Sequence, residues 1–352
     1  MVGAGPAGSS TARYAARRGL KVLLLDRRRV IGWPVQCGEY VAHNSEVERI
    51  FRGVSDLDDL MKASYAAKQI DTDLTRIISP RGRVYELPFK GFTVDRTAMD
   101  QGIAAQAVEE GAELMKGVAA IGIKGNKVVT SHAEYEGRLI VGADGPLSGV
   151  ARWAGLPHPV SAPAMSATIP GDFSSITDMY FGDLAPGGYA WIIPKGKTAN
   201  VGIGVWPQFR GNLRPFFDAF VKRLNLPPAH GTGGYVPILG PVKSTVKGDI
   251  ILVGDAAGHV MATNGGGINA SMICGRIAGE SVADHIHKGV PLAEYERRWR
   301  ELVGGPLRRS RNIRKLADHF FVNESRLEHA MSFLGAKRMG RAIRCKRLFF
   351  AR

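Results

Sequence analysis

The sequence predicts a mixed α/β fold in which a parallel-sheet domain is interrupted by an antiparallel sheet and followed by helices. Three observations carry this prediction. A glycine-rich turn and a helical pattern lead into a strand rich in Val and Leu at the start of the chain. Aromatic and alternating runs separated by Gly and Pro fill residues 162–206, and a buried strand returns at residues 250–253.

The first element is the turn Gly3-Ala4-Gly5-Pro6-Ala7-Gly8, which opens a predicted helix ending near Gly19. The strand Lys21–Asp26 follows, and this order is the beginning of a βαβ unit. Such a unit needs a strand before the first glycine, but only Met1 and Val2 precede it in this sequence. Either the first strand is very short, or the true start of the chain lies upstream.

The later elements are predicted from periodicity. Residues 97–110 have the apolar spacing of an amphipathic helix, and strands are expected at residues 127–130 and 138–141. A helix at residues 267–287 follows the strand at 250–253, so the first domain is discontinuous in sequence. The remainder is predicted to be helical, with an interruption near Gly304, Gly305 and Pro306.

Composition limits the possible classes of protein. A chain of 352 residues, 45% of them hydrophobic, buries a sizeable core. No run approaches the roughly 18 apolar residues of a membrane-spanning helix, and no apolar signal core is present. Cys37, Cys274 and Cys345 are too few and too scattered for a disulfide framework or a metal cluster. We expect a cytoplasmic protein without a metal.

The positive charge is unevenly distributed. The formal net charge is +15, and residues 306–352 contain 13 Lys and Arg against 3 Asp and Glu. This balance favours an anionic partner, which is a lipid surface, an acidic protein or nucleic acid, while a solvated helical face is the plainer alternative. No nucleic-acid-binding motif accompanies the charge, so no nucleic acid is expected.

The first glycine turn has the spacing of a dinucleotide site. The first glycine makes the turn, the second admits the pyrophosphate, and the third lets helix pack on strand. Asp26, at the end of the following strand, is placed to accept hydrogen bonds from the adenosine ribose. An ordinary turn with a surface Asp is the alternative.

Two later segments favour FAD over a nicotinamide cofactor. Strands end in tight, acid-bearing turns at Val141–Gly145 and again at Ile251–Gly258. Asp255 is a candidate for the ribitol hydroxyls, and Gly265, Gly266 and Gly267 open a helix whose positive end stabilises negative charge. The predicted domain boundaries are 1–60, 93–155 and 245–290 for the three parts of the Rossmann-like FAD-binding domain, 61–92 for a cap segment, 156–244 for the antiparallel-sheet substrate domain, and 291–352 for a basic C-terminal helical region.

With these motifs the sequence resembles the p-hydroxybenzoate hydroxylase type of flavoprotein and, more narrowly, the geranylgeranyl reductase family. Pro34–Glu39 is similar to that family's cysteine-bearing loop, and Pro186–Pro194 followed by Gly202 and Gly204 is similar to its substrate motif. Ile193 stands where the family usually has Phe, and flavin-dependent halogenases have a comparable Ile.

The resemblance implies an activity and a site. Reduced flavin would deliver a hydride to one carbon of an isolated alkene in an isoprenoid lipid chain, and a proton would reach the other. Tyr189 and Trp191, two apart on a strand, would wall an apolar tunnel, or else they are ordinary core. Cys37 is expected beside the flavin and Glu39 as a proton relay, with buried packing as the alternative for the thiol. The cofactor-binding candidates are Gly3, Gly5, Pro6, Ala7, Gly8, Asp26, Cys37, Gly38, Arg96, Asp144, Gly254, Asp255, Gly265, Gly266, Gly267 and Ile268, and the substrate-binding candidates are Tyr189, Trp191, Ile193, Pro194, Gly202 and Gly204.

Several alternatives stay open at this point. Arg96 contacts the FAD diphosphate or adenosine end, or it forms an ion pair with Asp95 or Asp100. The protein is an isoprenoid reductase, a flavin monooxygenase or halogenase of the same fold, or a non-catalytic lipid- or partner-binding relative. The electron donor is a ferredoxin, a reduced deazaflavin or NADPH. The basic C-terminal region is expected to rest on anionic lipid at the inner face of the cell membrane.

Overall fold

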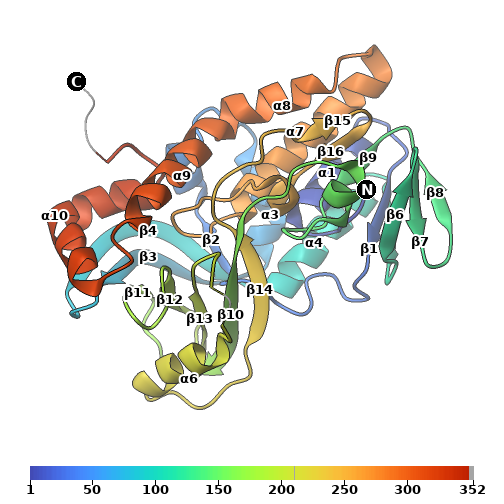
Figure 1. Ribbon diagram of the computed structural model, residues 1–352. Helices are drawn as coiled ribbons and strands as arrows, with labels where there is room; N and C mark the ends of the chain where they lie inside the picture. Colours follow the sequence, from blue (N-terminus) through green and yellow to red (C-terminus); the bar gives the residue numbers. More distant parts are fainter. Residues whose placement is uncertain (210, 349–352) are drawn as a thin grey trace.

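A computed structural model of the protein describes residues 1–209 and 211–348, so the last four residues of the predicted C-terminal region lie outside it. Figure 1 shows the α/β domain around the N-terminus, the strands of a large sheet beside it, and the C-terminal helices running along both. No helix in the described ranges is long and apolar enough to cross a membrane.

The parallel sheet of the α/β domain is completed by the first two residues. Val2 bridges in parallel to both Leu25 and Gly142, with its main-chain nitrogen 2.9 Å from the oxygen of Val141. In the given sequence the first strand is this bridging segment at Val2. It joins β1 (Leu23–Asp26) and its parallel partner β5 (Glu113–Lys116) to β9 (Ile140–Gly142), β16 (Ile250–Leu252) and β15 (Val246–Lys247).

Helices α1 (Pro6–Arg17) and α7 (Ile268–Lys288) pack closely because α7 presents two glycines to α1. A β-carbon on Gly275 would lie 2.6 Å from the main-chain oxygen of Ala7, and one on Gly279 would lie 2.6 Å from that of Thr11. Helix α4 (Arg96–Glu109) also packs on α1, and its bounds agree with the helix predicted at residues 97–110. The smaller elements nearby are α3 (Leu57–Ala66), α5 (Gly149–Ala154), the 3₁₀ turn η1 (Gly254–Ala257) and the sheet of β6 (Ala120–Lys124), β7 (Lys127–Thr130) and β8 (Glu134–Glu136).

The second sheet has eight strands in the order β14-β10-β13-β12-β11-β3-β4-β2. All neighbours are antiparallel except β11 and β3. The two segments predicted as cap and substrate domain thus contribute to one sheet, with α6 (Arg214–Arg223) packed on β10 and β13. The strands are β2 (Tyr40–Ala42), β3 (Lys68–Ile78), β4 (Val84–Val94), β10 (Ser161–Pro170), β11 (Thr177–Tyr180), β12 (Tyr189–Pro194), β13 (Thr198–Gly204) and β14 (Thr232–Pro237).

The C-terminal helices are more continuous than the sequence predicted. Between α8 (Ala293–Trp299) and α9 (Gly305–Asp318) the chain forms a π-helical segment, Arg300–Gly304, in place of a break. Pro306, which has no N–H to donate, lies at the start of α9 directly after this π-helical segment, where the hydrogen-bond spacing changes. Helix α10 (Glu324–Ile343) contains a kink at Gly335, where φ is 61°.

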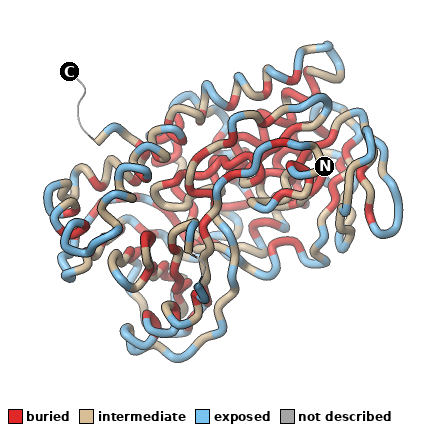
Figure 2. The backbone as a smooth tube through the Cα atoms, viewed as in Figure 1, coloured by how far each residue is buried: buried red, intermediate tan, exposed pale blue. Residues whose placement is uncertain are grey.

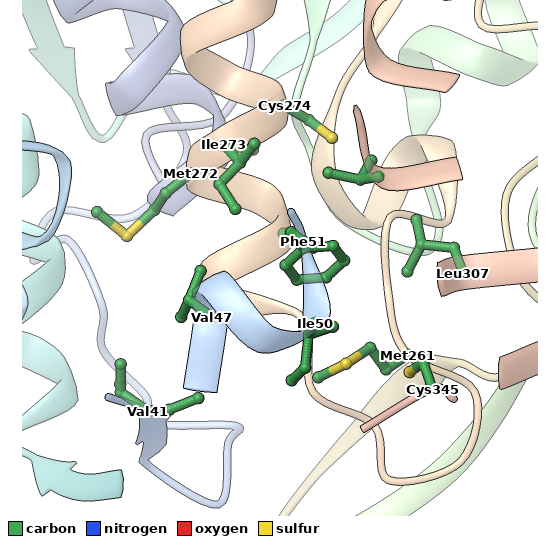
Figure 3. Packing of buried hydrophobic residues seen from close by; sticks show 14 of the residues in the cluster. Val41, Val47, Ile50, Phe51, Met261, Met272, Ile273, Cys274, Leu307 and Cys345 are labelled. Carbon is green, nitrogen blue, oxygen red and sulfur yellow. The ribbon is translucent and has the colours of Figure 1, made fainter. Parts of the chain in front are cut away.

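The largest hydrophobic cluster lies where α2 (Asn44–Ile50), α7 and the C-terminal helices meet (Figures 2 and 3). Figure 3 shows Phe51, Leu307 and Cys345 among the side chains that gather there. Cys274 on α7 is fully buried in this cluster, so its thiol packs in the core. The cluster joins the α/β domain to the C-terminal region, so the two cannot move independently without exposing apolar surface.

Candidate active site

A largely apolar pocket lies between the eight-stranded sheet and the start of α7. The loop Cys37–Glu39, strand β12 and the segment Gly265–Asn269 each contribute to its wall. The predicted residues that line it are Cys37, Gly38, Glu39, Tyr189, Trp191, Ile193, Gly204, Gly265, Gly266, Gly267 and Ile268. Segments more than 200 residues apart therefore meet around one cavity.

The Cys37 loop is fixed by a side chain from the sheet. The side-chain nitrogen of Asn200, on β13, donates to the main-chain oxygen of Cys37 at 2.8 Å and to Oε2 of Glu39 at 3.1 Å. The main-chain nitrogen of Glu39 donates to Sγ of Cys37 at 3.2 Å. Glu39 has φ of 61°, a left-handed conformation that a non-glycine residue holds only where its surroundings impose it.

Glu39 is part of a buried ion pair. Nζ of Lys195 lies 2.7 Å from Oε2 of Glu39, and the two side chains are only 8% and 3% exposed. The main-chain nitrogen of Arg96, at the start of α4, donates to Oε1 at 3.3 Å. Both carboxylate oxygens are thus occupied, as burial of a charge requires.

Trp191 and Tyr189 lie on the same side of β12, with ring centroids 5.8 Å apart. The indole nitrogen of Trp191 donates to Oδ1 of Asn200 at 2.8 Å, and its ring lies over Gly202, where a β-carbon would come within 2.3 Å of it. The Tyr189 hydroxyl donates to the main-chain oxygen of Asn264 at 2.6 Å. Burial raises the pKa of Tyr189 to about 12, so it stays protonated at neutral pH.

The first glycine turn has the form of a phosphate cradle. A β-carbon on Gly3 would lie 2.4 Å from the oxygen of Ala143, and one on Gly8 would lie 1.8 Å from that of Gly3, so both positions require glycine. A β-carbon on Gly5 would meet no atom within 4 Å. The amino end of α1 has no side-chain cap, which leaves its amides available to an anion.

Two carboxylates fit the remainder of FAD. Asp26 accepts from the main-chain nitrogen of Ala4 at 2.8 Å, which holds it beside the glycine turn. Asp255 has no hydrogen-bond partner for its carboxylate within the described ranges, and burial raises its pKa to about 6 against the opposing charge of Arg96. The carboxylate of Asp255 can accept hydrogen bonds from the hydroxyls of a ligand. The amino end of α7 has no side-chain cap, so its positive end can face a ring that gains negative charge on reduction.

The remaining predicted residues lie away from the pocket wall. Gly254 contacts Ala7 of the glycine turn. Arg96 donates through Nε and Nη2 to the buried Asp100, at 2.8 and 3.2 Å, which is one of the two alternatives given by the sequence. Asp144 accepts from Ser148 and Val150 and so stabilises the start of α5. Gly202 lies against the Trp191 ring, and Pro194 is the last residue of β12. The roles of Gly3, Gly5, Pro6, Ala7, Gly8, Asp26, Arg96, Asp144, Pro194, Gly202, Gly254 and Asp255 stay predictions.

Sequence reasoning missed Asn200 and Lys195. Each is a polar residue beside or within an apolar strand, and a buried polar residue in such a strand is the signal that was available. Asn200 lies 163 residues from Cys37 and 161 residues from Glu39 along the chain, and Lys195 pairs with the same Glu39. No local pattern therefore identifies either residue.

Comparison with known proteins gives matches along most of the chain. Residues 165–231 match the family model of the geranylgeranyl reductase catalytic domain, and residues 1–62 match an NAD(P)-binding Rossmann-like domain. A digeranylgeranylglycerophospholipid reductase from Methanosarcina acetivorans is 33% identical over 338 residues, covering 86% of this chain and 80% of the relative.

Solved structures agree. A geranylgeranyl bacteriochlorophyll reductase-like protein from Thermoplasma acidophilum superposes with a TM-score of 0.81 at 26% identity, covering 94% of this chain and 89% of that one. A halogenase variant in complex with FAD has a TM-score of 0.71 at 15% identity, covering 93% and 77%. The second likeness shows a shared fold alone.

Proposed function

The chain belongs to the family of digeranylgeranylglycerophospholipid reductases, and from this premise we propose that it saturates carbon–carbon double bonds in the geranylgeranyl chains of membrane lipids or their precursors, with FAD as cofactor. The observation that carries the proposal is the apolar pocket, in which the Cys37 loop, the start of α7 and the Trp191 wall face one cavity. An oxygen-using relative is the second reading, but its likeness is limited to the fold.

The cofactor is expected to span two parts of the chain. The glycine turn and the amino end of α1 would hold the diphosphate, Asp26 the adenosine ribose, and Asp255 the ribitol. The segment Gly265–Ile268 would lie at the isoalloxazine ring. When bound, FAD in its reduced form supplies the hydride for one alkene carbon.

The chain's own residues position the alkene and exclude water. An isolated double bond offers no charge to bind, so the enzyme relies on apolar contact along Trp191, Tyr189 and Ile193. The Asn200 hydrogen bond fixes the indole, and Gly202 provides room for its ring. A fixed wall keeps the chain in one register and keeps solvent from the reacting carbons.

Cys37 is the proposed residue for the proton. Its Sγ lies at the pocket wall, and its loop is held by Asn200, so the sulfur can hold a proton at a defined place. A relay through Glu39 stays a prediction. Because its carboxylate accepts from Lys195, Asn200 and the Arg96 amide, such a relay runs through these contacts.

The basic C-terminal region gives a second proposal, contact with anionic lipid headgroups. A groove between α2, β4 and α10 is lined by Arg49, Lys337, Arg341, Arg344 and Lys346, with Glu86 as the acidic residue in its wall. Arg49 and Arg344 also pair with the buried Glu46 of α2, so the carboxylate of Glu46 compensates part of this charge. Burial lowers the pKa of Lys346, as do neighbouring arginines, which indicates crowded positive charge. Each basic residue near an anionic surface contributes about 1 kcal/mol. The same charge favours an acidic ferredoxin among the three possible donors.

The function is tested by turnover without oxygen. Chemically reduced protein, incubated under argon with a digeranylgeranyl glycerophospholipid, should yield lipid with two added hydrogens for each double bond saturated, detected by mass spectrometry. A lipid changed only when air is admitted would favour the oxygen-using alternative.

A further inference from the structure

One cation lines the apolar pocket. Of the described residues in its wall, only Glu39 and Arg314 carry a formal charge, and Glu39 is neutralised by Lys195. Arg314 lies on α9, and its side chain is only 9% exposed. A guanidinium in such a setting needs partners for its N–H groups.

The partners of Arg314 leave part of the guanidinium unused. Nε donates to Oδ1 of Asp318 at 2.7 Å, and Nη2 donates to the main-chain oxygen of Gly187 at 2.5 Å. The guanidinium lies over the ring of Phe321, 5.2 Å from its centroid. Within the part of the chain that the structure describes, Nη1 has no hydrogen-bond partner. Asp318 is 34% exposed, so solvent screens the pair from that side.

A row of aromatic rings runs from Trp191, at the reactive end of the pocket, to Phe321 beside Arg314, and of these rings Trp191 and Tyr189 line the pocket itself. Successive centroids are 5.8 Å apart from Trp191 to Tyr189, 5.7 Å from Tyr189 to Phe181, and 6.0 Å from Phe181 to Phe321. At one end of this row, Trp191 is linked to the Cys37 loop by hydrogen bonds through the side chain of Asn200. Arg314, stacked on Phe321, therefore lies at the other end of the row.

We propose that Arg314 binds the phosphate of the glycerophospholipid substrate and thereby sets the direction in which the lipid lies in the pocket. This inference rests on the proposed function. The unused N–H groups match the oxygens of a phosphate, and a charge-assisted hydrogen bond in a largely apolar site is strong. With the headgroup held at Arg314, the isoprenoid chain extends past Tyr189 and Trp191, which line the pocket, toward Cys37.

The test compares two lipids that differ only in charge. Digeranylgeranylglycerol phosphate and uncharged digeranylgeranylglycerol are presented in the same detergent micelles to wild type, Arg314→Gln, Arg314→Lys and Lys315→Gln. Lys315 is an exposed cation on the same helix and serves as the matched control. We expect Arg314→Gln to lower kcat/KM for the phosphate lipid by about tenfold, mainly through KM, because one charged hydrogen bond is lost. Turnover of the uncharged lipid should stay within about twofold, Arg314→Lys should recover part of the preference, and Lys315→Gln should match wild type.

Three results would overturn the inference. Equal losses on both lipids would make Arg314 a clamp for the Gly187 loop only, and no loss on either would remove it from the site. A wild-type enzyme without preference for the phosphate lipid would refute it even if Arg314→Gln does not fold. Failure of the proposed function is distinct, because wild type would then saturate neither lipid.

Discussion

The side chain of Asn200 donates to the main-chain oxygen of Cys37 at 2.8 Å, so a strand of the eight-stranded sheet holds the loop that carries the candidate thiol. The same side chain accepts from the indole of Trp191. The thiol and the substrate wall are thus positioned by one amide, although 163 residues separate Asn200 from Cys37.

Asn200→Ala should uncouple these groups. The buried indole N–H and one carboxylate oxygen lose a partner, which costs about 1–3 kcal/mol in the free energy of unfolding. We expect kcat for alkene saturation to fall at least about tenfold while bound FAD is retained, because the lost bonds lie on the substrate side. Stopped-flow kinetics and flavin absorbance measure both. Full activity would show that the loop needs no such anchor.

Cys37→Ser should slow alkene saturation by about tenfold or more with the fold intact, because the hydroxyl is a weaker acid than the thiol it replaces. Cys274→Ser is the matched control. Its thiol is fully buried in the core, so we expect lower thermal stability without a comparable effect on kcat. A wild-type rate for Cys37→Ser would show that the thiol has a packing role only and does not deliver the proton.

Gly202→Ala should displace the Trp191 indole, because the new β-carbon would lie 2.3 Å from the ring. Gly233→Ala on β14 is the control, since its β-carbon would find its nearest neighbour at 3.8 Å. We expect KM for the lipid to rise about tenfold in the first variant only, with similar FAD content in both. Equal KM values for the lipid in the two variants would show that the Gly202 contact does not position the indole.

Gly5→Val separates cofactor binding from folding. Space is open around a β-carbon at Gly5, so the FAD-free protein should keep its melting temperature within a few degrees while losing retained flavin. Gly8→Ala should instead destabilise the fold by more than about 2 kcal/mol, because its β-carbon would clash with the Gly3 oxygen. Retention of yellow colour by Gly5→Val would refute the phosphate assignment.

Asp255→Asn predicts a pH-dependent difference in stability. Burial raises the pKa of Asp255 from 3.8 to about 6, so the folded state holds the proton more tightly than the unfolded chain does. Stability contributed by the neutral acid is present below about pH 4 and is lost as pH rises through about 6. The FAD-free variant, which cannot ionise, should exceed wild type by about 1–3 kcal/mol at neutral pH, with no excess near pH 4. Urea denaturation across this range measures it, and a difference independent of pH would contradict it.

The sequence predicted elements whose cause is local. These elements are the glycine turn, the helix after Asp95 and the strands at 127–130 and 250–253. Each follows from the spacing of glycine or apolar residues within its own segment, without contacts from distant parts of the chain. Pairing of Val2 with the strand after the glycine turn was also predictable, because a βαβ unit requires a strand before that turn. The Cys37 loop and the Trp191 motif came from the family resemblance, since a lone thiol and two strand aromatics have no distinctive pattern of their own.

What the sequence could not predict depends on distant contacts. Lys195 and Asn200 acquire meaning only when β12 and β13 pack on the Cys37 loop. Arg314 is one of many cations in the C-terminal region, and only the fold shows that its side chain is buried at the pocket. The π-helical segment Arg300–Gly304 likewise replaces a predicted break, because packing of Val303 in the core keeps the chain helical.

The proposed function depends on one step, the transfer of electrons from FAD to an isoprenoid double bond in this pocket. The most direct measurement is a single turnover under argon, in which the FAD-loaded protein is chemically reduced, freed of excess reductant and mixed with the phosphate lipid. We expect the visible flavin absorbance to return on mixing, with one double bond saturated for each FAD that is reoxidised. Flavin that stays bleached until oxygen is admitted, with the lipid unchanged, would contradict it.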